Sequence, residues 1–442
     1  MTAADTHARE SITLWERWIV MAGIMLATFW AAWCATLPQL PVNPASRFAT
    51  MESLVERNTW SIDQASMRTI DKVQFEGRFY SSKPPLMAFI GAGVYYALHH
   101  WADLSFAEKK YPTVAAMNLP LSVLPWLLGC VVFVRLTHYL VRRSGVRIWA
   151  GLSFTFGTLP IAYAASLDNH TWSVTALLVS AWALLPLVAS QESDSPTPSQ
   201  LPIWRAALAG LAAGGAFTFD LGAGPIIGLV GLAVAWRMLL GGPRQTAPFA
   251  VFVLAGLAFP ALQSGILLYM SGDFKPFYLR PDAYQYEGSY WRNPTEFDAL
   301  HEPRWVYALH ALVGHHGLFS HSPWLLLGAA WFFSRETSFR ARILQWALAG
   351  SVLFIIGYYV ARTNNYGGRC VGMRWFMVLT PVLALAAARY ADRFDLFNRR
   401  TELLVGASTF SAIACTSGTV NPWEEGLILA LLRGLGAGSV AG

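Results

Sequence analysis

The chain has 442 residues, of which 55% are hydrophobic and only 13% are charged. Soluble domains carry about 25% charged residues, so this composition excludes an ordinary soluble protein. The net charge of +6 does not indicate nucleic-acid binding, because most basic residues sit in short loops between apolar runs. We therefore predict one integral membrane domain over residues 1–442, an all-α, polytopic transmembrane helical bundle of about 11–13 membrane helices.

Apolar runs suited to a membrane recur along the chain. In chain order they cover residues 18–38, 113–141, 147–167, 172–189, 206–219, 222–240, 246–269, 320–334, 343–361, 375–390 and 403–419. Shorter runs cover 84–101 and 425–438. Basic clusters mark cytoplasmic loops, and they lie at 135–147, 236–245, 334–342 and 389–400. We predict that the run 84–101 enters the membrane without crossing it, because only then do all the basic clusters fall on the cytoplasmic side.

Three polar segments interrupt this pattern: a first extracytoplasmic loop at 39–83, a second large loop at 271–319 and a shorter segment at 362–374. In the predicted topology they face away from the cytoplasm, together with the turn at 168–171. The unusual polar motifs therefore gather on one face, as an extracytoplasmic active site would require. The cysteines show no Cys-x-x-Cys or Cys/His spacing. We therefore predict neither a disulfide framework nor a zinc site with cysteine ligands.

The first loop begins with "SRFATMESLVERN", whose apolar residues follow a helical spacing. We predict an interfacial amphipathic helix on the membrane surface, capped by Ser46. Its polar face would carry Arg47, Glu52, Glu56 and Arg57. The alternative is a solvated interfacial helix without chemistry.

The rest of the first loop is rich in charge. Asp63, Asp71, Lys72, Arg78 and Lys83 follow within a short stretch, and Lys83 directly precedes two prolines that favour the first turn of a helix. A carboxylate close to cations can act as a general base, and the cations can hold a phosphate. A solvated loop with incidental charges is the alternative.

Two further positions join apolar runs. In "LDNHTW", Asp168 and Asn169 are explained by a tight turn, whereas His170 is the less ordinary residue and is a candidate site residue. Asp220 ends an apolar run, where an ionisable residue indicates either function or a cap of the next run. Both interpretations are kept.

The stretch "LHALVGHHGLFSHSP" holds His310, His315, His316 and His321. No carboxylate pair or cysteine shares their spacing, so we predict no metal ligands here, and the glycines favour a tight bend instead. A divalent cation is left open as a cofactor, and no other cofactor is predicted.

The segment "ARTNNYGGRCVGMRWF" offers arginines, amides and a Gly-Gly pair between two apolar runs. Arginines bind phosphate bidentately, and glycines let the backbone approach a ligand closely. We predict a phosphate or sugar site formed by Arg362, Asn365, Tyr366, Arg369 and Arg374. A structured loop with arginines at lipid headgroups is the alternative.

The first loop resembles that of membrane glycosyltransferases of the C-type superfamily, in particular the lipid A aminoarabinose transferases and the protein mannosyltransferases. In that family an Arg-Tyr-Ala-Glu helix follows the first span and a Lys-Pro-Pro-Leu motif opens the next helix. Arg47-Phe48-Ala49 and Lys83-Pro84-Pro85-Leu86 match these motifs. The pieces "GHHGLFSHSPWLLLG" and "NNYGGRCVGMRWFMVLTP" are similar to a bacterial branch of the same group, so the likeness covers most of the chain in layout.

This resemblance implies a transferase that uses a polyprenyl-phosphate-linked sugar and acts at membrane lipid. Lys83 inherits the contact with the donor phosphate. The other residues proposed to bind that phosphate are Arg47, Arg78, Arg362 and Arg374. Those proposed to bind substrate are His170, Asn365, Tyr366 and Arg369.

The sequence departs from the family at the catalytic base. Pro44 stands where family members have an acidic residue, and Ser82 replaces the acid that precedes the lysine in the aminoarabinose group. We place Asp71 in the role of base, with Glu52 and Asp168 as alternatives.

The predicted reaction is an inverting sugar transfer, assisted by a general base, to an acceptor at the outer face of the cytoplasmic (inner) membrane. A transporter or flippase of lipid-linked sugars is one alternative, for which Asp220 and Arg135 are the candidate ionisable residues in the bundle. A non-catalytic lipid-phosphate-binding membrane protein is another. The sequence does not indicate the sugar, the acceptor or the oligomeric state.

Overall fold

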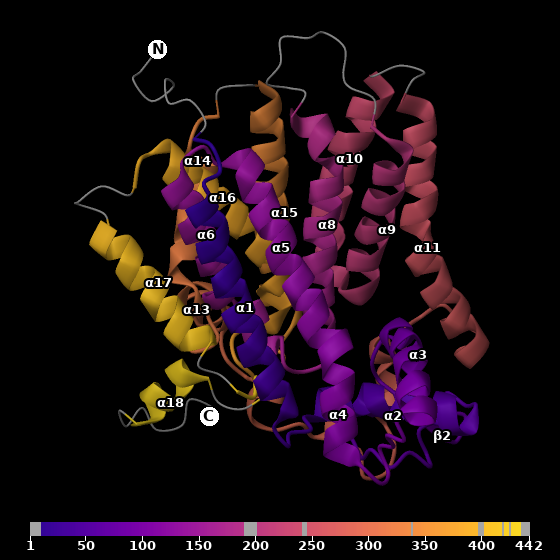
Figure 1. The fold of residues 1–442 in the computed structure, drawn as a ribbon. Helices are drawn as coiled ribbons and strands as arrows, with labels where there is room; N and C mark the ends of the chain where they lie inside the picture. The colour runs from indigo at the N-terminus through magenta and orange to yellow at the C-terminus, as the bar shows by residue number, and fades with distance from the viewer. Residues whose placement is uncertain are drawn as a thin grey trace.

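A computed structural model describes residues 10–189, 201–240, 245–336, 339–396, 402–417, 420–423 and 426–434. The basic clusters at 236–245, 334–342 and 389–400 lie in part outside these residues. Within them, nearly all regular structure is helical, and the long helices run roughly alongside one another as a bundle (Figure 1). This arrangement confirms the predicted all-α class.

The bundle is built mainly from α1 (Leu14–Thr36), α5 (Leu124–Leu140), α6 (Ser144–Phe156), α8 (Asn169–Ala189), α9 (Ile203–Phe219), α10 (Gly224–Leu240), α11 (Thr246–Ser271), α14 (Leu326–Phe333), α15 (Phe339–Arg362), α16 (Thr380–Arg393) and α17 (Glu402–Thr416). Among the described residues, 5 helices are long and apolar enough to cross a membrane: Leu14–Thr36, Lys110–Leu140, Asn169–Leu187, Thr246–Ser271 and Ala341–Arg362. Shorter apolar helices cover Ile203–Phe219, Leu221–Trp236, Pro323–Phe333 and Glu402–Thr416. The chain is a polytopic helical bundle.

The apolar run at 147–167 is not one continuous helix. α6 ends at Phe156 with Gly157 as its cap, and the short helix α7 (Leu159–Tyr163) follows. Pro160 stands in the first turn of α7, where its missing N–H costs nothing, but it could not continue α6.

The smaller elements gather at one end of the bundle. These are α2 (Val42–Arg57), β1 (Lys72–Phe75), β2 (Arg78–Ser81), α3 (Pro85–Trp101), α4 (Lys110–Asn118), α12 (Arg304–Leu312), α13 (Leu318–His321) and α18 (Leu427–Gly434). In Figure 1 α2, α3, α4 and β2 lie at the lower end, whereas α14 and α16 are labelled toward the upper end. At that opposite end, the N–H of Glu10 donates to the carbonyl of Arg142, and Arg143 pairs with Asp392. The polar loops and these basic residues therefore occupy opposite ends, as predicted.

α3 begins at the Pro-Pro pair and stays at the loop end of the bundle (Figure 1). It packs on α2 through Leu86, Met87 and Tyr95, which form one buried cluster with Phe48 and Met51. The helices approach closely at Gly91, where an added Cβ would lie 2.3 Å from Met51. α3 therefore lies with α2 at the loop end of the bundle (Figure 1).

The first loop contains a β-hairpin that the sequence analysis did not predict. β1 and β2 pair antiparallel, with Lys72 opposite Ser81 and Phe75 opposite Arg78. Glu76 and Gly77 both have positive φ, as a two-residue hairpin turn requires. The alternation in "KVQFEGRFYS" around a Glu-Gly turn was the available signal.

The prediction of an amphipathic helix on the membrane surface is wrong for α2, and so is the alternative of a solvated helix. Residues 43–53 are all buried, because the rest of the first loop folds over the helix. Ser46 does not cap the helix, which starts earlier, at Val42. Its hydroxyl instead donates to the carbonyl of Asp71 at 2.5 Å. Arg47 and Glu52 are therefore buried residues, and each must have partners.

Candidate functional site

The hairpin places Lys83 against Asp71. Asp71 directly precedes β1, and Lys83 follows β2 after Ser82, so the antiparallel pairing brings the two together. The Nζ atom of Lys83 lies 2.8 Å from Oδ2 of Asp71, and the side chains are 18% and 8% exposed. The backbone carbonyl of Asp71 accepts hydrogen bonds from Ser46 and Ser82. The ion pair is thus largely removed from water and fixed by the fold.

Arg47 is a buried cation on α2, 2% exposed. Its guanidinium donates to the side-chain oxygen of Asn43 one turn earlier, and at 2.5 Å to Oδ1 of Asn169 at the start of α8. Its Nε has no hydrogen-bond partner in the described part of the chain. Burial lowers the pKa of Arg47 to about 10, with Asp168 opposing the shift, so it stays charged at neutral pH. Neutral amides hold this charge without neutralising it.

Asp168 caps α8. Its Oδ2 accepts hydrogen bonds from the N–H groups of His170 at 3.0 Å and Thr171 at 3.2 Å. Its Oδ1 is buried and unpaired among the described residues. Such an oxygen is costly to bury, and it is free to accept a proton or a hydrogen bond from a ligand.

His170 and Asp220 form a buried pair, with Nδ1 of His170 2.5 Å from Oδ2 of Asp220. The other oxygen of Asp220 accepts from the N–H of Gly222 at 2.9 Å and so caps the short helix that follows. Asp220 is therefore both a cap, as one interpretation predicted, and the partner of a candidate site residue.

Arg374 joins the cluster from the segment after the Gly-Gly pair. Its guanidinium lies 4.5 Å above the ring of Trp423, and its Nε is buried without a hydrogen-bond partner where the structure is described. Gly367, with φ +89°, packs against it, since an added Cβ would lie 2.9 Å from the Arg374 Nε. A side chain at position 367 would push Arg374 away.

The cations of this cluster repel one another. Burial lowers the pKa of Lys83 below its usual 10.5, Asp71 opposes that shift, and Arg374 and Arg47 add to it. Burial also raises the pKa of Asp298 in the second large loop, while Arg374 and Lys83 lower it. We call this group the lysine–arginine cluster; it consists of Arg47, Lys83 and Arg374 with Asp71 and Asp168. An added anion would reduce the repulsion between its positive charges.

A small cavity opens beside Arg47. It is lined by Arg47, Pro84, Met87, Asn169, Thr218, Phe219 and Gln263. One end is polar, formed by Arg47 and Asn169, and much of the remaining wall is apolar. Gln263 on α11 presents a buried, unpaired side-chain oxygen to the same region. The cavity lies among α2, α3, α8, α9 and α11, so its apolar part borders the membrane helices.

The other predicted site residues lie elsewhere or have structural partners. Both oxygens of Glu52 accept hydrogen bonds from the N–H of Ser66, at 2.8 and 3.0 Å, and Glu52 also pairs with Arg57 at 2.9 Å. Asn365 accepts from the N–H of Gly367 at 2.9 Å. Among the predicted site residues, Arg78, Arg362 and Arg369 are exposed.

The residues that hold the cluster in place were not predicted from the sequence. Asn43 and Asn169 orient Arg47, and Trp423 supports Arg374. Asn43, one helical turn before Arg47, was a usable signal, because residues four apart face one another on a helix. Nothing in the sequence pairs Trp423 with Arg374.

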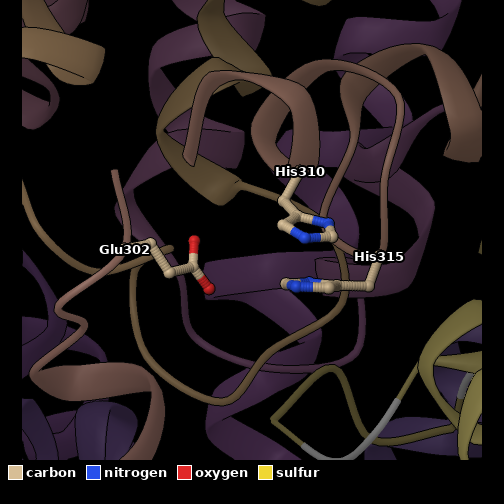
Figure 2. Close-up of side chains that lie close together, drawn as sticks. All are labelled: Glu302, His310 and His315. Carbon is tan, nitrogen blue, oxygen red and sulfur yellow. The ribbon is translucent and has the colours of Figure 1, made fainter. Parts of the chain in front are cut away.

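A second polar cluster lies around the histidines. Glu302, His310 and His315 each offer one ligand atom, and these atoms all lie within 4.8 Å of one another (Figure 2). Burial lowers the pKa of His315 to about 3, with His310 and His321 adding to the shift. Tyr366, predicted to bind substrate, instead donates its hydroxyl to Glu302 at 2.6 Å. The prediction of no metal ligands rested on the histidine motif alone, and Glu302 lies outside it.

No protein-family model and no curated protein sequence matches the chain. Solved structures do. ArnT from Cupriavidus metallidurans bound to undecaprenyl phosphate matches with a TM-score of 0.57 and 14% identity, over 92% of this chain and 65% of that one. The apo form of the same protein matches with a TM-score of 0.55 and 12% identity, over 87% of this chain and 61% of that one. A third match is the archaeal oligosaccharyltransferase AglB from Archaeoglobus fulgidus, solved in complex with an inhibitory peptide and a dolichol-phosphate. It has a TM-score of 0.51 and 13% identity, over 93% of this chain and 57% of that one.

These likenesses confirm the resemblance at the level of the fold. The chain is a multi-pass helical membrane protein that shares its fold with ArnT and AglB. It spans less than two thirds of the length of each of these structures.

Proposed function

We propose that the chain is a glycosyltransferase that moves a sugar from a polyprenyl-phosphate-linked donor to an extracytoplasmic acceptor. The observation that carries this proposal is the lysine–arginine cluster, in which Lys83, Arg47 and Arg374 concentrate positive charge beside a partly apolar cavity. A lipid phosphate supplies both the missing anion and an apolar tail. ArnT was solved with undecaprenyl phosphate and AglB with a dolichol-phosphate, which supports this ligand class.

The donor phosphate would bind between Lys83 and the arginines. Guanidinium groups hold phosphate oxygens in bidentate geometry, and the ammonium group acts as a point charge. The polyprenyl chain would leave along Met87 and Phe219, toward the face of α11, much of which is exposed in the structure. This arrangement keeps the phosphate at the loop end and the tail among apolar side chains.

Binding of the phosphate would also prepare the base. Lys83 is now paired with Asp71, so a phosphate that attracts Lys83 leaves the Asp71 carboxylate able to accept a proton. Asp71 takes the proton of the acceptor hydroxyl, whose oxygen bonds to the anomeric carbon on the face opposite the phosphate. The bond from that carbon to the phosphate oxygen breaks, and its electron pair stays on the polyprenyl phosphate, where the cations stabilise it. The product has the inverted configuration.

The other carboxylates are less suited to this role. Glu52 has its oxygens occupied by Ser66 and Arg57, so we assign it to holding the first loop on α2. Asp168 caps α8 with one oxygen and has the other unpaired, and it is the alternative base. The His170–Asp220 pair would fix the α8 start, from which Asn169 reaches Arg47.

We place the reaction at the outer face of the cytoplasmic membrane. The basic residues around Arg142 and Arg143 lie at the end of the bundle opposite the site, and such residues favour the cytoplasmic side. The exposed Arg78 and Arg362 would then face the acceptor or the sugar on the outer side.

Native mass spectrometry of the detergent-purified protein with undecaprenyl phosphate tests the proposal. Wild type and Lys109→Ala, which removes an exposed lysine paired with Asp103, should bind the lipid equally. Lys83→Ala should bind it at least about tenfold more weakly, the loss of a charged hydrogen bond. Equal binding by Lys83→Ala would remove the central support. Binding without transfer from an undecaprenyl-phosphate sugar to any acceptor class would instead indicate a non-catalytic lipid-phosphate-binding protein.

A further inference from the structure

We propose that Glu302, His310 and His315 bind one divalent transition-metal ion of the zinc class. Their ligand atoms already lie within 4.8 Å of one another, and the Glu302 carboxylate faces the two imidazole rings (Figure 2). In a tetrahedral zinc site the ligand atoms lie about 3.3 Å apart. The His310 and His315 rings are stacked, with centroids 4.1 Å apart, so their side chains would rotate to close the set around one ion. Two imidazoles and a carboxylate form a known three-residue zinc set that leaves a fourth position open.

One ring nitrogen each of His310 and His315 is buried without a hydrogen-bond partner in the described part of the chain. Nδ1 of His315 pairs with Nδ1 of His316 at 2.5 Å, which leaves Nε2 of His315 as its ligand atom. That Nε2, like Nδ1 of His310, has no hydrogen-bond partner among the residues that the structure describes. A buried polar atom without a partner costs about 1–3 kcal/mol. A bound metal would satisfy ring nitrogens that the protein leaves unpaired.

A neighbouring tyrosine orients the carboxylate. The Tyr366 hydroxyl donates to Oε2 of Glu302 at 2.6 Å, so Oε1 is the oxygen available to a metal. Tyr366 is itself fully buried and stacks on His316, with ring centroids 4.7 Å apart and planes 12° apart. Hydrogen bonds of this kind fix the orientation of metal ligands in known sites.

The donor set favours zinc over magnesium or calcium. Magnesium and calcium prefer sites built from oxygen atoms, whereas imidazole nitrogens suit zinc, copper, nickel and iron. The three residues offer two imidazole nitrogens and one carboxylate. A hard cation such as magnesium or calcium would therefore bind weakly.

The metal site would be linked to a second loop through the hydrogen bond from Tyr366 to Glu302. The ligands come from the segment 302–315, whereas Tyr366 belongs to the segment that contains Gly367, on which Arg374 packs. Backbone hydrogen bonds already join these segments, from Leu300 to Asn364 and from Met373 to His316. A metal would therefore stabilise the loop that carries Arg374. This proposal stands independently of the transferase assignment.

The test measures zinc on full-length, detergent-purified protein after chelation, titration with ZnCl₂ and desalting. Wild type should retain about one zinc per chain, and its Tm should rise with zinc and fall with EDTA. His310→Gln and His315→Gln should lose this zinc, whereas His301→Gln, an exposed histidine next to Glu302, should keep it. Tyr366→Phe should keep zinc with roughly 10–100-fold weaker affinity.

A wild type that retains no more zinc than His310→Gln, or a His301→Gln protein that loses as much, would overturn the proposal. So would saturable binding of Mg²⁺ in place of zinc. Co²⁺ loading of the wild type keeps the test independent of variant folding. The visible bands of a four-coordinate nitrogen/oxygen site are expected, and only the weak spectrum of aqueous Co²⁺ would contradict the site.

Discussion

Asp71 precedes the first strand of the β-hairpin and Lys83 follows the second strand, so both lie at its open end. An ion pair of 2.8 Å joins them there. The pairing of Lys72 with Ser81 sets this geometry, since it carries the flanking residues to the same edge. The pair is therefore built into the local fold of the first loop. It also holds the lysine of the Lys-Pro-Pro motif directly before the first turn of α3.

The Lys83–Asp71 pair should show strong non-additivity in stability. Lys83→Gln leaves the Asp71 carboxylate largely buried and uncompensated, and removing one partner of such a pair costs about 3 kcal/mol. Lys83→Gln/Asp71→Asn removes both charges and should recover most of the lost Tm. Thermal unfolding in detergent measures both proteins. A double variant no more stable than Lys83→Gln would show that the pair is not coupled in the folded protein.

Asp71→Asn should abolish transfer while preserving donor binding. The amide cannot accept the acceptor's proton, and loss of a general base lowers the rate by about 10²–10⁴-fold. Lys83 is released from its partner, so binding of undecaprenyl phosphate should be unchanged or tighter. Asp103→Asn, which removes an exposed carboxylate at the same end of the chain's fold, is the matched control and should transfer normally. Normal turnover by Asp71→Asn would pass the role of base to Asp168.

The membrane fold was predictable because its signals are local and repeated. Apolar runs predicted the helices, and the Lys-Pro-Pro pair marked the start of α3. The orientation that the basic clusters indicate stays a prediction. The small hairpin was missed because a two-stranded pair in a polar loop lacks the apolar face that sequence patterns detect. α2 was misjudged because its polar residues are covered by residues that follow it in the same loop, and spacing alone does not show such cover.

The candidate site was only partly predictable for a similar reason. Lys83, Asp71 and Arg47 belong to one loop, so their proximity in sequence suggested proximity in space. The contacts of Arg47 with Asn169 and of Glu302 with Tyr366 join residues far apart in the chain. They depend on how the helices pack, and a single sequence does not encode that packing in a local pattern.

Arg47→Lys should weaken donor binding although it keeps the charge. Arg47 donates to Asn43 and Asn169 from two nitrogens at once, and a single ammonium group cannot reproduce this geometry. Loss of one charged hydrogen bond is worth about 1.5–3 kcal/mol, so Kd for undecaprenyl phosphate should rise roughly 10–150-fold. Native mass spectrometry measures it, with Arg68→Lys in the exposed part of the same loop as the control. Unchanged affinity in Arg47→Lys would remove Arg47 from the phosphate site.

The affinity for undecaprenyl phosphate should fall as the pH rises into the alkaline range. Burial lowers the pKa of Lys83 below 10.5, Asp71 offsets part of the shift, and Arg374 and Arg47 lower the pKa further. A bound phosphate adds negative charge next to the amine and therefore raises the pKa of Lys83 in the complex.

The sign of the dependence follows from these two pKa values. At a pH below the pKa that Lys83 has in the free protein, its amine is charged both in the free protein and in the complex, and Kd is constant. Between the two pKa values, binding takes up a proton, so Kd should rise about tenfold for each pH unit. Lys83→Arg keeps its charge across this range and should give a flat curve. Kd is measured at pH values from about 7 up to about 10, below the ordinary lysine pKa of about 10.4. If Lys83→Arg shows the same slope as wild type, then another group carries the titration.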